Sequence, residues 1–377
     1  MAGYIFSMDS LDSIQDCFEN GLYGTLLNEP KKELWSMPNE GTFADYASMK
    51  EGDYVFFFNK RKIYGIGKLK NIYASDDKSI VDCKFLNFPK ADEPKKMTID
   101  SNLFLAMKST RQRFICSFQP APGFFIDGVD MDDALSSNPN CFRMLRAFWK
   151  LSFVKLDDDE AECLFDIVLK KCYFKSLGFV SHYKNKHMKI SKKLSKDYLL
   201  NSKNILKFAS DGDKSKHEMA VEAAIIDQLT KADSHTINIF GKWHYISHQV
   251  IASPFKAIDY MDKIDIFAYS YIEGHRTKNK YAVMELKKDK AIQDDVEQLL
   301  KYVDWIKDEY AGQDYSSINA FLVAYEFEAN VKAYVNEYAK RNYTIGRRPI
   351  LSDTWNDIKL IKYRYDKTTN KLNFTIT

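Results

Sequence analysis

The sequence predicts an α+β chain in three parts: a small β-rich module, a helical connector and an α/β domain with a mixed central sheet. The chain has 377 residues, which is enough for two or three domains. Its hydrophobic content of 45% and aromatic content of 14% can fill their interiors. The hydrophobic pattern changes along the chain from short strand-like runs to helices that alternate with strands. We therefore expect domains at 1–155, 156–210 and 211–377.

Composition restricts the class of protein. The net charge of +3 neither requires nor excludes a polyanionic partner. Six cysteines are scattered without a CxxC pair, and no signal peptide is visible, so we expect reduced thiols, no zinc site and a cytoplasmic protein. No run approaches the roughly 18 apolar residues of a membrane span. No Walker motif is present, so we expect no nucleoside triphosphate as a partner.

The first part opens with a strand at "YIFSM" and a helix that Asp9, Ser10 or Asp12 can cap and Gly21 can end. The strand-like runs that follow are "DYVFFFN", "KIYGIGKLKNIY", "SIVDCKFLNF" and "RQRFICSF". This pattern is typical of a small curved β module. The segment "CFRMLRAFWKLSFVKL" (141–156) is its expected closing element.

The connector starts with the acidic cap of "DDDEAECLFDIVLKK" and continues into "KNKHMKISKKLSK" (184–196), which carries six lysines and no acid. Such a run is either a solvated helix face or an arm that contacts phosphates. The candidate DNA-backbone contacts are Lys184, Lys186, Lys189, Lys192 and Lys193.

From about residue 213 the apolar spacing becomes helical in "KHEMAVEAAIIDQLTK" and again in "DDVEQLLKYVDWI". The runs "KIDIFAYS", "KYAVMELKK" and "INAFLVAYEF" read as strands. Strands that alternate with helices favour an α/β domain with a mixed sheet.

Two of these strands carry charge inside apolar runs. The polar segment "YIEGHRTKNK" can return the chain antiparallel, so that Asp265 and Glu285 meet on adjacent strands with Lys287 on the same face. Two close carboxylates are costly to bury unless a cation lies between them. Oxygen ligands suit Mg²⁺, with Mn²⁺ as an alternative, and a neighbouring lysine can orient or deprotonate a water. This is the chemistry of phosphodiester hydrolysis. The other interpretation is a surface Glu–Lys pair on an edge strand.

The array Asp265…Glu285-Leu286-Lys287 resembles the core of the PD-(D/E)xK nucleases. An upstream helix offers Glu218 and Glu222 on one face, where such nucleases place a further acid, and we favour Glu222. The resemblance implies that Asp265 and Glu285 are metal ligands, and that hydrolysis leaves 5′-phosphate and 3′-hydroxyl ends.

Downstream, "QLLKY" places Gln298 and Tyr302 one helical turn apart, like the QxxxY element of RecB-like nucleases. The resemblance makes these residues phosphate contacts or supports of the site. Residues 213–335 look like the carboxy-terminal domain of NucS-type endonucleases and, more distantly, like Shedu-type defence nucleases. Two departures are Lys263, where relatives often carry glycine, and Pro254, which is too far from Asp265 for a PD pair.

The segments "GYIFSMDSLDSIQDCFENGLYGT" and "MKEGDYVFFFNKRKIYGIGKL" resemble YTH and EVE domains, PUA-like β-barrel modules that read modified bases. Reading a base requires taking it out of the stack, and aromatic walls repay part of that cost. The candidate base-binding residues are Tyr23, where relatives have tryptophan, with Trp35, Phe43 and Tyr46. The other interpretation is that these rings fill the module's own core.

Together these patterns predict a modification-dependent endonuclease of restriction or defence type, which flips a modified base of double-stranded DNA and cuts the backbone as a homodimer. One alternative is a repair or defence nuclease, NucS-like or Shedu-like, that recognises a DNA structure or end. Another is a non-catalytic nucleic-acid-binding protein, and RNA remains open as a substrate. We assign no role to His244 or His248, which read as core or surface histidines.

Overall fold

The chain passes three times between two separate units of structure. Unit 1 comprises Met1–Pro30 and Met49–Leu200, and unit 2 comprises Lys31–Ser48 and Asn201–Thr377. The structure is a computed structural model that describes residues 1–28, 36–89, 98, 100–104, 111–121, 128–142, 153–172, 181–252 and 262–377. Trp35 and most of the expected closing element therefore lie outside the described residues.

This division differs from the three expected domains. The expected connector is shared out: its helices up to Leu200 group with unit 1, and the helix after it groups with unit 2. The short segment Lys31–Ser48 joins unit 2 although it lies within the expected first domain. The reason is packing, because helix α2 (Met37–Ala47) lies against helix α7 (Glu218–Thr230) of unit 2.

Unit 1 is built on a mixed sheet with strand order β10-β1-β3-β4-β8-β2. Strand β7 also pairs with β8, and strand β9 also pairs with β4. Its strands are β1 (Gly3–Ser7), β2 (Leu22–Leu26), β3 (Tyr54–Asn59), β4 (Lys62–Leu69), β5 (Ile72–Tyr73), β6 (Val81–Asp82), β7 (Lys84–Leu86), β8 (Arg113–Pro120), β9 (Val129–Asp130) and β10 (Phe153–Leu156). Its helices are α1 (Leu11–Asn20), α3 (Met131–Ser137), α4 (Asp158–Cys172) and α5 (Tyr183–Ser191), with a 3₁₀ turn at Lys196–Tyr198. Among the described residues no ladder joins β2 to β10, so strand pairing does not close the expected barrel.

The ends of α1 follow the predicted signals. Ser10 is the N-cap, and its hydroxyl accepts the backbone N–H of Ser13 at 3.1 Å. Gly21 ends the helix in the left-handed region, at φ 61°, where a residue without Cβ is favoured.

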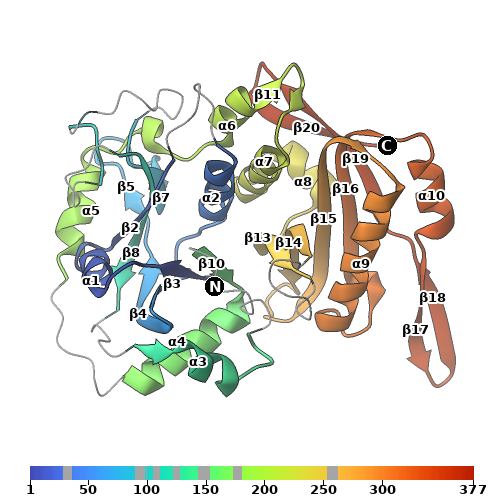
Figure 1. Cartoon of the computed structure of the whole chain (residues 1–377), viewed down its shortest axis with the longest axis horizontal. Coiled ribbons are helices and arrows are strands. Elements are labelled where there is room, and N and C mark those ends of the chain that lie inside the picture. Colours follow the sequence, from blue (N-terminus) through green and yellow to red (C-terminus); the bar gives the residue numbers. More distant parts are fainter. Residues whose placement is uncertain are drawn as a thin grey trace. The chain divides into compact units, whose positions relative to one another are not determined.

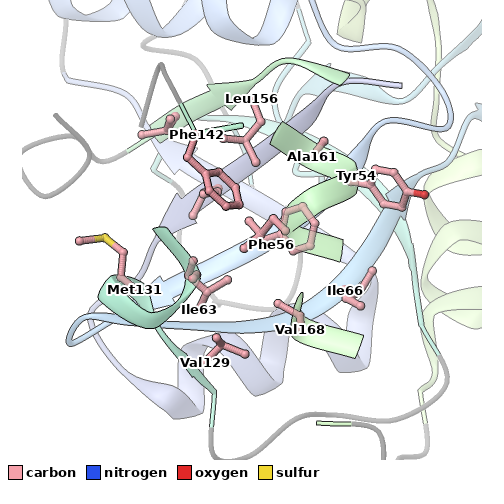
Figure 2. Close-up of a cluster of buried hydrophobic side chains, with 14 residues drawn as sticks. Tyr54, Phe56, Ile63, Ile66, Val129, Met131, Phe142, Leu156, Ala161 and Val168 are labelled. Carbon is pink, nitrogen blue, oxygen red and sulfur yellow. The ribbon is translucent and has the colours of Figure 1, made fainter. Parts of the chain in front are cut away.

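One face of the unit 1 sheet carries an apolar core that is shared with α4 (Figure 2). Tyr54 and Phe56 from β3 and Leu156 from β10 meet Ala161 and Val168 of the helix. Neighbouring side chains along β3 point to the opposite face, where Phe57 packs with other aromatic rings.

Unit 2 is built on a six-stranded mixed sheet of order β13-β14-β15-β16-β19-β20. Its strands are β11 (Ser210–Asp211), β12 (Lys214–Ser215), β13 (Tyr245–Ile251), β14 (Lys263–Tyr271), β15 (Lys278–Ala291), β16 (Ile318–Phe327), β17 (Arg341–Arg347), β18 (Ile350–Trp355), β19 (Ile358–Asp366) and β20 (Lys371–Ile376). Its helices are α2, α6 (Ser202–Ala209), α7, α8 (Ser234–Phe240), α9 (Gln293–Glu309) and α10 (Val331–Tyr338), with a 3₁₀ turn at Tyr315–Ser317. The first three sheet strands pair antiparallel, and β15, β16 and β19 pair parallel, so the expected mixed sheet is present.

Helices cover both sides of this sheet (Figure 1). In Figure 1, α7 and α8 lie along one side and α9 along the other. Almost every residue in the middle of α7 is buried, which leaves two of its acids, Glu222 and Asp227, inside the unit. Within the described part of the chain, no helix is both long and apolar enough to cross a membrane.

Candidate active site

Three polar side chains form a row across the first three strands of the unit 2 sheet. The β14–β15 register pairs Ile266 with Met284, which places Asp265 opposite Glu285. The β13–β14 register pairs Val250 with Ile264 and places Gln249 on the other side of Asp265. Directly opposed residues of antiparallel strands share a face. Asp265 and Glu285 therefore lie opposite each other on neighbouring strands, as the sequence predicts.

Asp265 is held by two hydrogen bonds. Its Oδ2 accepts the backbone N–H of Leu286 at 2.8 Å, and its Oδ1 accepts from Nε2 of Gln249 at 3.2 Å. Burial raises the pKa of Asp265 well above its usual range, and the nearby carboxylates of Glu285 and Glu222 raise it further. Three acids therefore converge on this point of the sheet.

Glu285 is only 2% exposed, and its two oxygens differ. Oε1 accepts from Nζ of Lys287 at 2.6 Å, whereas Oε2 is buried and has no hydrogen-bond partner among the described residues. Burial raises the pKa of Glu285 to about 7, against the opposing effect of the Lys287 ammonium group. A buried, unpartnered carboxylate oxygen is uncommon, because it loses the stabilisation that water gave it.

Lys287 is fixed between two acids on the same side of the sheet. Besides Glu285, its Nζ lies 3.6 Å from Oδ1 of Asp295, whose other oxygen accepts the N–H of Ile292 at the start of α9. Burial lowers the pKa of Lys287, but Glu285 and Asp295 outweigh burial and raise the pKa above its usual range. The side chain therefore favours its ammonium form, which donates to Glu285.

Glu222 enters the site from α7 and is 2% exposed. Its Oε1 pairs with Nδ1 of His248 at 2.7 Å, and its Oε2 accepts from Nε2 of Gln249 at 3.2 Å. The other candidate acid on this helix, Glu218, accepts the backbone N–H of Lys288 at a longer 3.4 Å. Both acids thus face the site, Glu222 on the Asp265 side and Glu218 on the side of β15.

The backbone at Gln249 explains how two successive residues of β13 reach one carboxylate. Side chains that follow each other in a regular strand point to opposite faces. Gln249 has a φ of +51°, in the left-handed region that residues other than glycine rarely adopt. The turn that results lets both His248 and Gln249 bond to Glu222.

The predicted helix pair on α9 is also in contact. Nε2 of Gln298 donates to the hydroxyl of Tyr302 at 2.7 Å. Burial raises the pKa of Tyr302 to about 12, and Glu285 and Asp265 add to the shift, although the bond from Gln298 opposes it. Tyr302 therefore lies within electrostatic reach of the carboxylate row and keeps its proton.

The donor set fits a hard divalent cation in part. Asp265 and Glu285 offer carboxylate oxygens, one of them unpartnered, and Mg²⁺ typically takes one or two carboxylates with water and phosphate oxygens. In the part of the chain that the structure describes, no three His, Cys, Asp or Glu side chains group closely enough to hold a metal ion on their own. A cation here would therefore depend on phosphate and water oxygens as well.

Three of the expected base-binding residues lie in the interior. Tyr23 is 7% exposed and stacks on Phe6 with ring centroids 3.9 Å apart. Phe43 and Tyr46 are buried on α2 and belong to unit 2. Trp35 lies outside the described residues. Base binding stays a prediction for these four residues.

The expected backbone contacts Lys184, Lys186 and Lys189 lie on α5, and Lys192 and Lys193 follow it. Four of these lysines are exposed, and Lys186 is half-buried. Nζ of Lys193 donates to the carbonyl oxygen of Asp100 at 2.9 Å. Contact with phosphate stays a prediction for this group.

Four residues of this site were missed from the sequence: Asp45, His248, Gln249 and Asp295. One signal could have found two of them. An acid in the middle of an apolar helix, as Glu222 is, requires donors nearby, and the "SHQV" segment of a neighbouring strand supplies two. No signal points to Asp45, because it lies 203 residues away from His248.

No family model and no curated protein matches the chain. A comparison with solved structures finds the crystal structure of a repair endonuclease from Pyrococcus abyssi, with 22% sequence identity and a TM-score of 0.21. The match covers 35% of this chain and 47% of that chain. A similarity of this size carries no argument about fold or function, so the proposals below rest on the site itself.

Proposed function

We propose that this protein is a Mg²⁺-dependent endodeoxyribonuclease of the PD-(D/E)xK type. The observation that carries the proposal is the pairing of Asp265 with Glu285 across two antiparallel strands, with Lys287 bonded to Glu285 at 2.6 Å. Like charges at close range are unfavourable in a folded interior unless they serve to bind a cation. A purely structural Glu–Lys pair leaves the half-buried Asp265 and the unpartnered Oε2 of Glu285 unexplained.

Each side chain has a role that its contacts suit. Asp265 and Glu285 would hold the cation, which when bound supplies positive charge to the scissile phosphate and lowers the pKa of a water. The ammonium group of Lys287 would orient the attacking water and stabilise negative charge on the phosphate. Glu222 would support Asp265 through Gln249, and Gln298 and Tyr302 would contact phosphate through their polar ends. The expected products carry 5′-phosphate and 3′-hydroxyl ends.

The direct test is cleavage of supercoiled plasmid DNA with Mg²⁺ and with a chelator. Wild-type protein should nick or linearise the plasmid only with the metal, and Glu285→Ala should lower the rate by at least about 100-fold. Asp289→Ala is the matched control, because this acid lies on the same strand and its side chain is 55% exposed. Cleavage by Glu285→Ala at the wild-type rate would refute the assignment.

Base modification as the recognition signal, and a role in restriction or defence, are supported only by the sequence pattern of unit 1. A side-by-side digestion of methylated, unmethylated and mismatched duplexes separates a modification-dependent enzyme from a structure-dependent one. Incubation with single-stranded and with duplex RNA tests whether RNA is also a substrate. Cutting both strands takes two such centres, so we also expect a homodimer, which analytical ultracentrifugation can check.

A further inference from the structure

Helix α2 brings one more charged residue to the candidate site. Asp45 lies on this helix, and its Oδ1 is 2.7 Å from Nε2 of His248. His248 is largely buried, and its other ring nitrogen pairs with Glu222, also at 2.7 Å. One imidazole is therefore fixed between two carboxylates that come from two helices. An imidazole held at both nitrogens cannot rotate about its ring axis, so it determines where each carboxylate sits.

The hydrogen bonds continue from Glu222 to the centre of the site. Gln249 donates to Oε2 of Glu222 and to Oδ1 of Asp265, in each case at 3.2 Å. The order of contacts is thus Asp45, His248, Glu222, Gln249 and Asp265. The backbone of Gln249 has a φ of +51°, a conformation that residues other than glycine rarely adopt and that is often found at functional sites.

We propose that Asp45 and His248 are positioning residues of the nuclease site. They hold the Glu222 carboxylate, and Gln249 relays that position to Asp265, the expected cation ligand. The inference rests on the proposed function for its catalytic meaning. The chain of contacts itself stands on geometry and can be tested separately. It makes α2, a segment from early in the sequence, a part of the active site.

A second contact between α2 and α7 shows what simple helix docking looks like. Glu40 of α2 is 0% exposed, and its Oε1 pairs with Nδ1 of His217 at 2.9 Å. His217 is the N-cap residue of α7. This pair, like Asp45 and His248, links an acid of α2 to a histidine, but its contacts lead to the start of α7 and not to Asp265. Glu40→Gln is therefore the matched control for a substitution at Asp45.

The first measurement is cleavage kinetics at saturating Mg²⁺. Asp45→Ala and His248→Gln should lower kcat about 10- to 100-fold with little change in KM for DNA, as is typical when a residue behind a metal ligand is lost. Asp45→Asn keeps an acceptor oxygen for the imidazole and should recover most of the rate. Glu40→Gln keeps an acceptor oxygen for His217 and should leave kcat near the wild-type value.

The second measurement needs neither metal nor DNA. Changes in melting temperature for Asp45→Ala and Glu222→Gln should be non-additive, because His248 contacts both carboxylates, and should become additive in a His248→Gln background. Glu40→Gln combined with Glu222→Gln should be additive in either background. Asp45 is partly exposed on a helix surface, so its substitution to alanine is expected to leave the protein folded.

The outcomes separate the two proposals. A kcat for Asp45→Ala no lower than that for Glu40→Gln, or an additive cycle with Glu222→Gln, overturns the positioning role. If Glu285→Ala cleaves DNA like the wild type, the proposed nuclease function fails, and the melting-temperature cycle alone decides whether Asp45 and His248 set the position of Glu222.

Discussion

Each unit has an aspartate with a raised pKa, buried in unit 1 and half-buried in unit 2, and the two sites differ in the charges around it. In unit 1, Asp53 is 6% exposed and accepts the backbone N–H groups of Ala2 at 3.1 Å and Lys50 at 3.0 Å. Burial raises its pKa to about 6, and Lys155 and Lys50 counteract the rise. In unit 2, Asp265 also accepts two hydrogen bonds, but the charges closest to it include two further carboxylates.

This difference teaches how to recognise a site inside a fold. A raised pKa occurs at both aspartates, so it does not mark function by itself. Asp53 has positively charged neighbours, and its hydrogen bonds join separate segments of the chain. Asp265 has two negatively charged neighbours, Glu285 and Glu222, whose repulsion Lys287 opposes and a bound cation would relieve further. The convergence of like charges is therefore the informative feature.

The largest expected effect is the loss of DNA cleavage when Lys287, next to Glu285 in unit 2, is replaced. Lys287→Met removes an ammonium group bonded to Glu285 while keeping a side chain of similar length. We expect plasmid cleavage to fall about 10²- to 10⁴-fold, the range typical for loss of a positioned proton donor. Lys290→Met is the control, because Lys290 lies on the same strand, is 55% exposed and pairs with Glu328. Equal rates for both variants would contradict a role for Lys287.

The pH dependence of cleavage tests the raised pKa in unit 2. Glu285 must be ionised to bind a cation, and its pKa is about 7 in the folded protein. At limiting Mg²⁺ the rate should rise with pH up to a plateau above this value and be about 100-fold lower at pH 5. Protons and metal compete for the same oxygens, so raising Mg²⁺ should move the midpoint to lower pH. A flat profile between pH 5 and pH 8 would show that Glu285 is not the group that titrates.

Replacing each aspartate by asparagine should change stability to different extents. At Asp265 the folded-state pKa lies above its value in the unfolded chain, so the cost of the ionised form appears as the pH rises and is complete above the folded-state pKa. Asp265→Asn should therefore stabilise the protein at pH 8, on the order of 1–2 kcal/mol, with a smaller gain at lower pH.

Asp53→Asn should stabilise the protein less than Asp265→Asn at pH 8. The raised pKa of Asp53 has the same sign, but its ionised form keeps the counter-charges of Lys155 and Lys50, which the amide loses. Urea unfolding at pH 5 and pH 8 measures both variants. Equal gains for the two variants at pH 8 would break the distinction between the two sites.

The smallest expected effect concerns charges at the surface of unit 1. Lys189→Ala with Lys192→Ala should weaken DNA binding uniformly across sequences and lower the salt slope of binding by about 2. Thermal stability should not change, since both side chains are exposed. The control is Lys62→Ala with Lys78→Ala, which removes the same amount of charge elsewhere on unit 1. The salt slope of DNA binding should stay closer to the wild-type value for this control than for the Lys189/Lys192 variant. Equal slopes for the two double variants would identify the α5 lysines as a solvated face.

Much of unit 2 could be predicted from local patterns. The strands around Asp265 and Glu285, the antiparallel turn between them and the helix with Gln298 and Tyr302 follow from apolar spacing and from the period of side-chain directions. These signals act over about 20 residues. The position of α2 could not be predicted, because its partner helix is far away in the sequence and amphipathic spacing does not say which surface it covers.

For the aromatic residues of unit 1, the sequence does not decide whether a ring is exposed or buried. Tyr23 follows a helix and precedes a polar loop, a position equally compatible with a cage and with a core. Only the register of β2 against β8 and the stacking of Tyr23 on Phe6 decide that it is interior. A ring's position in the sequence does not reveal how many of its faces are covered, whereas a pair of like charges carries its own physical cost.

The insertion of α2 into unit 2 has a consequence for how the protein is made. The ribosome releases α2 about 170 residues before α7, a delay of roughly 10–35 s at typical elongation rates of about 5–20 residues per second. During that interval the helix has no partner to cover Phe43 and Tyr46. Nascent chains should therefore be vulnerable to aggregation or chaperone capture until α7 appears, and a carboxy-terminal fragment that starts at Asn201 should recover its helix partner only when residues 36–48 are supplied on a second polypeptide.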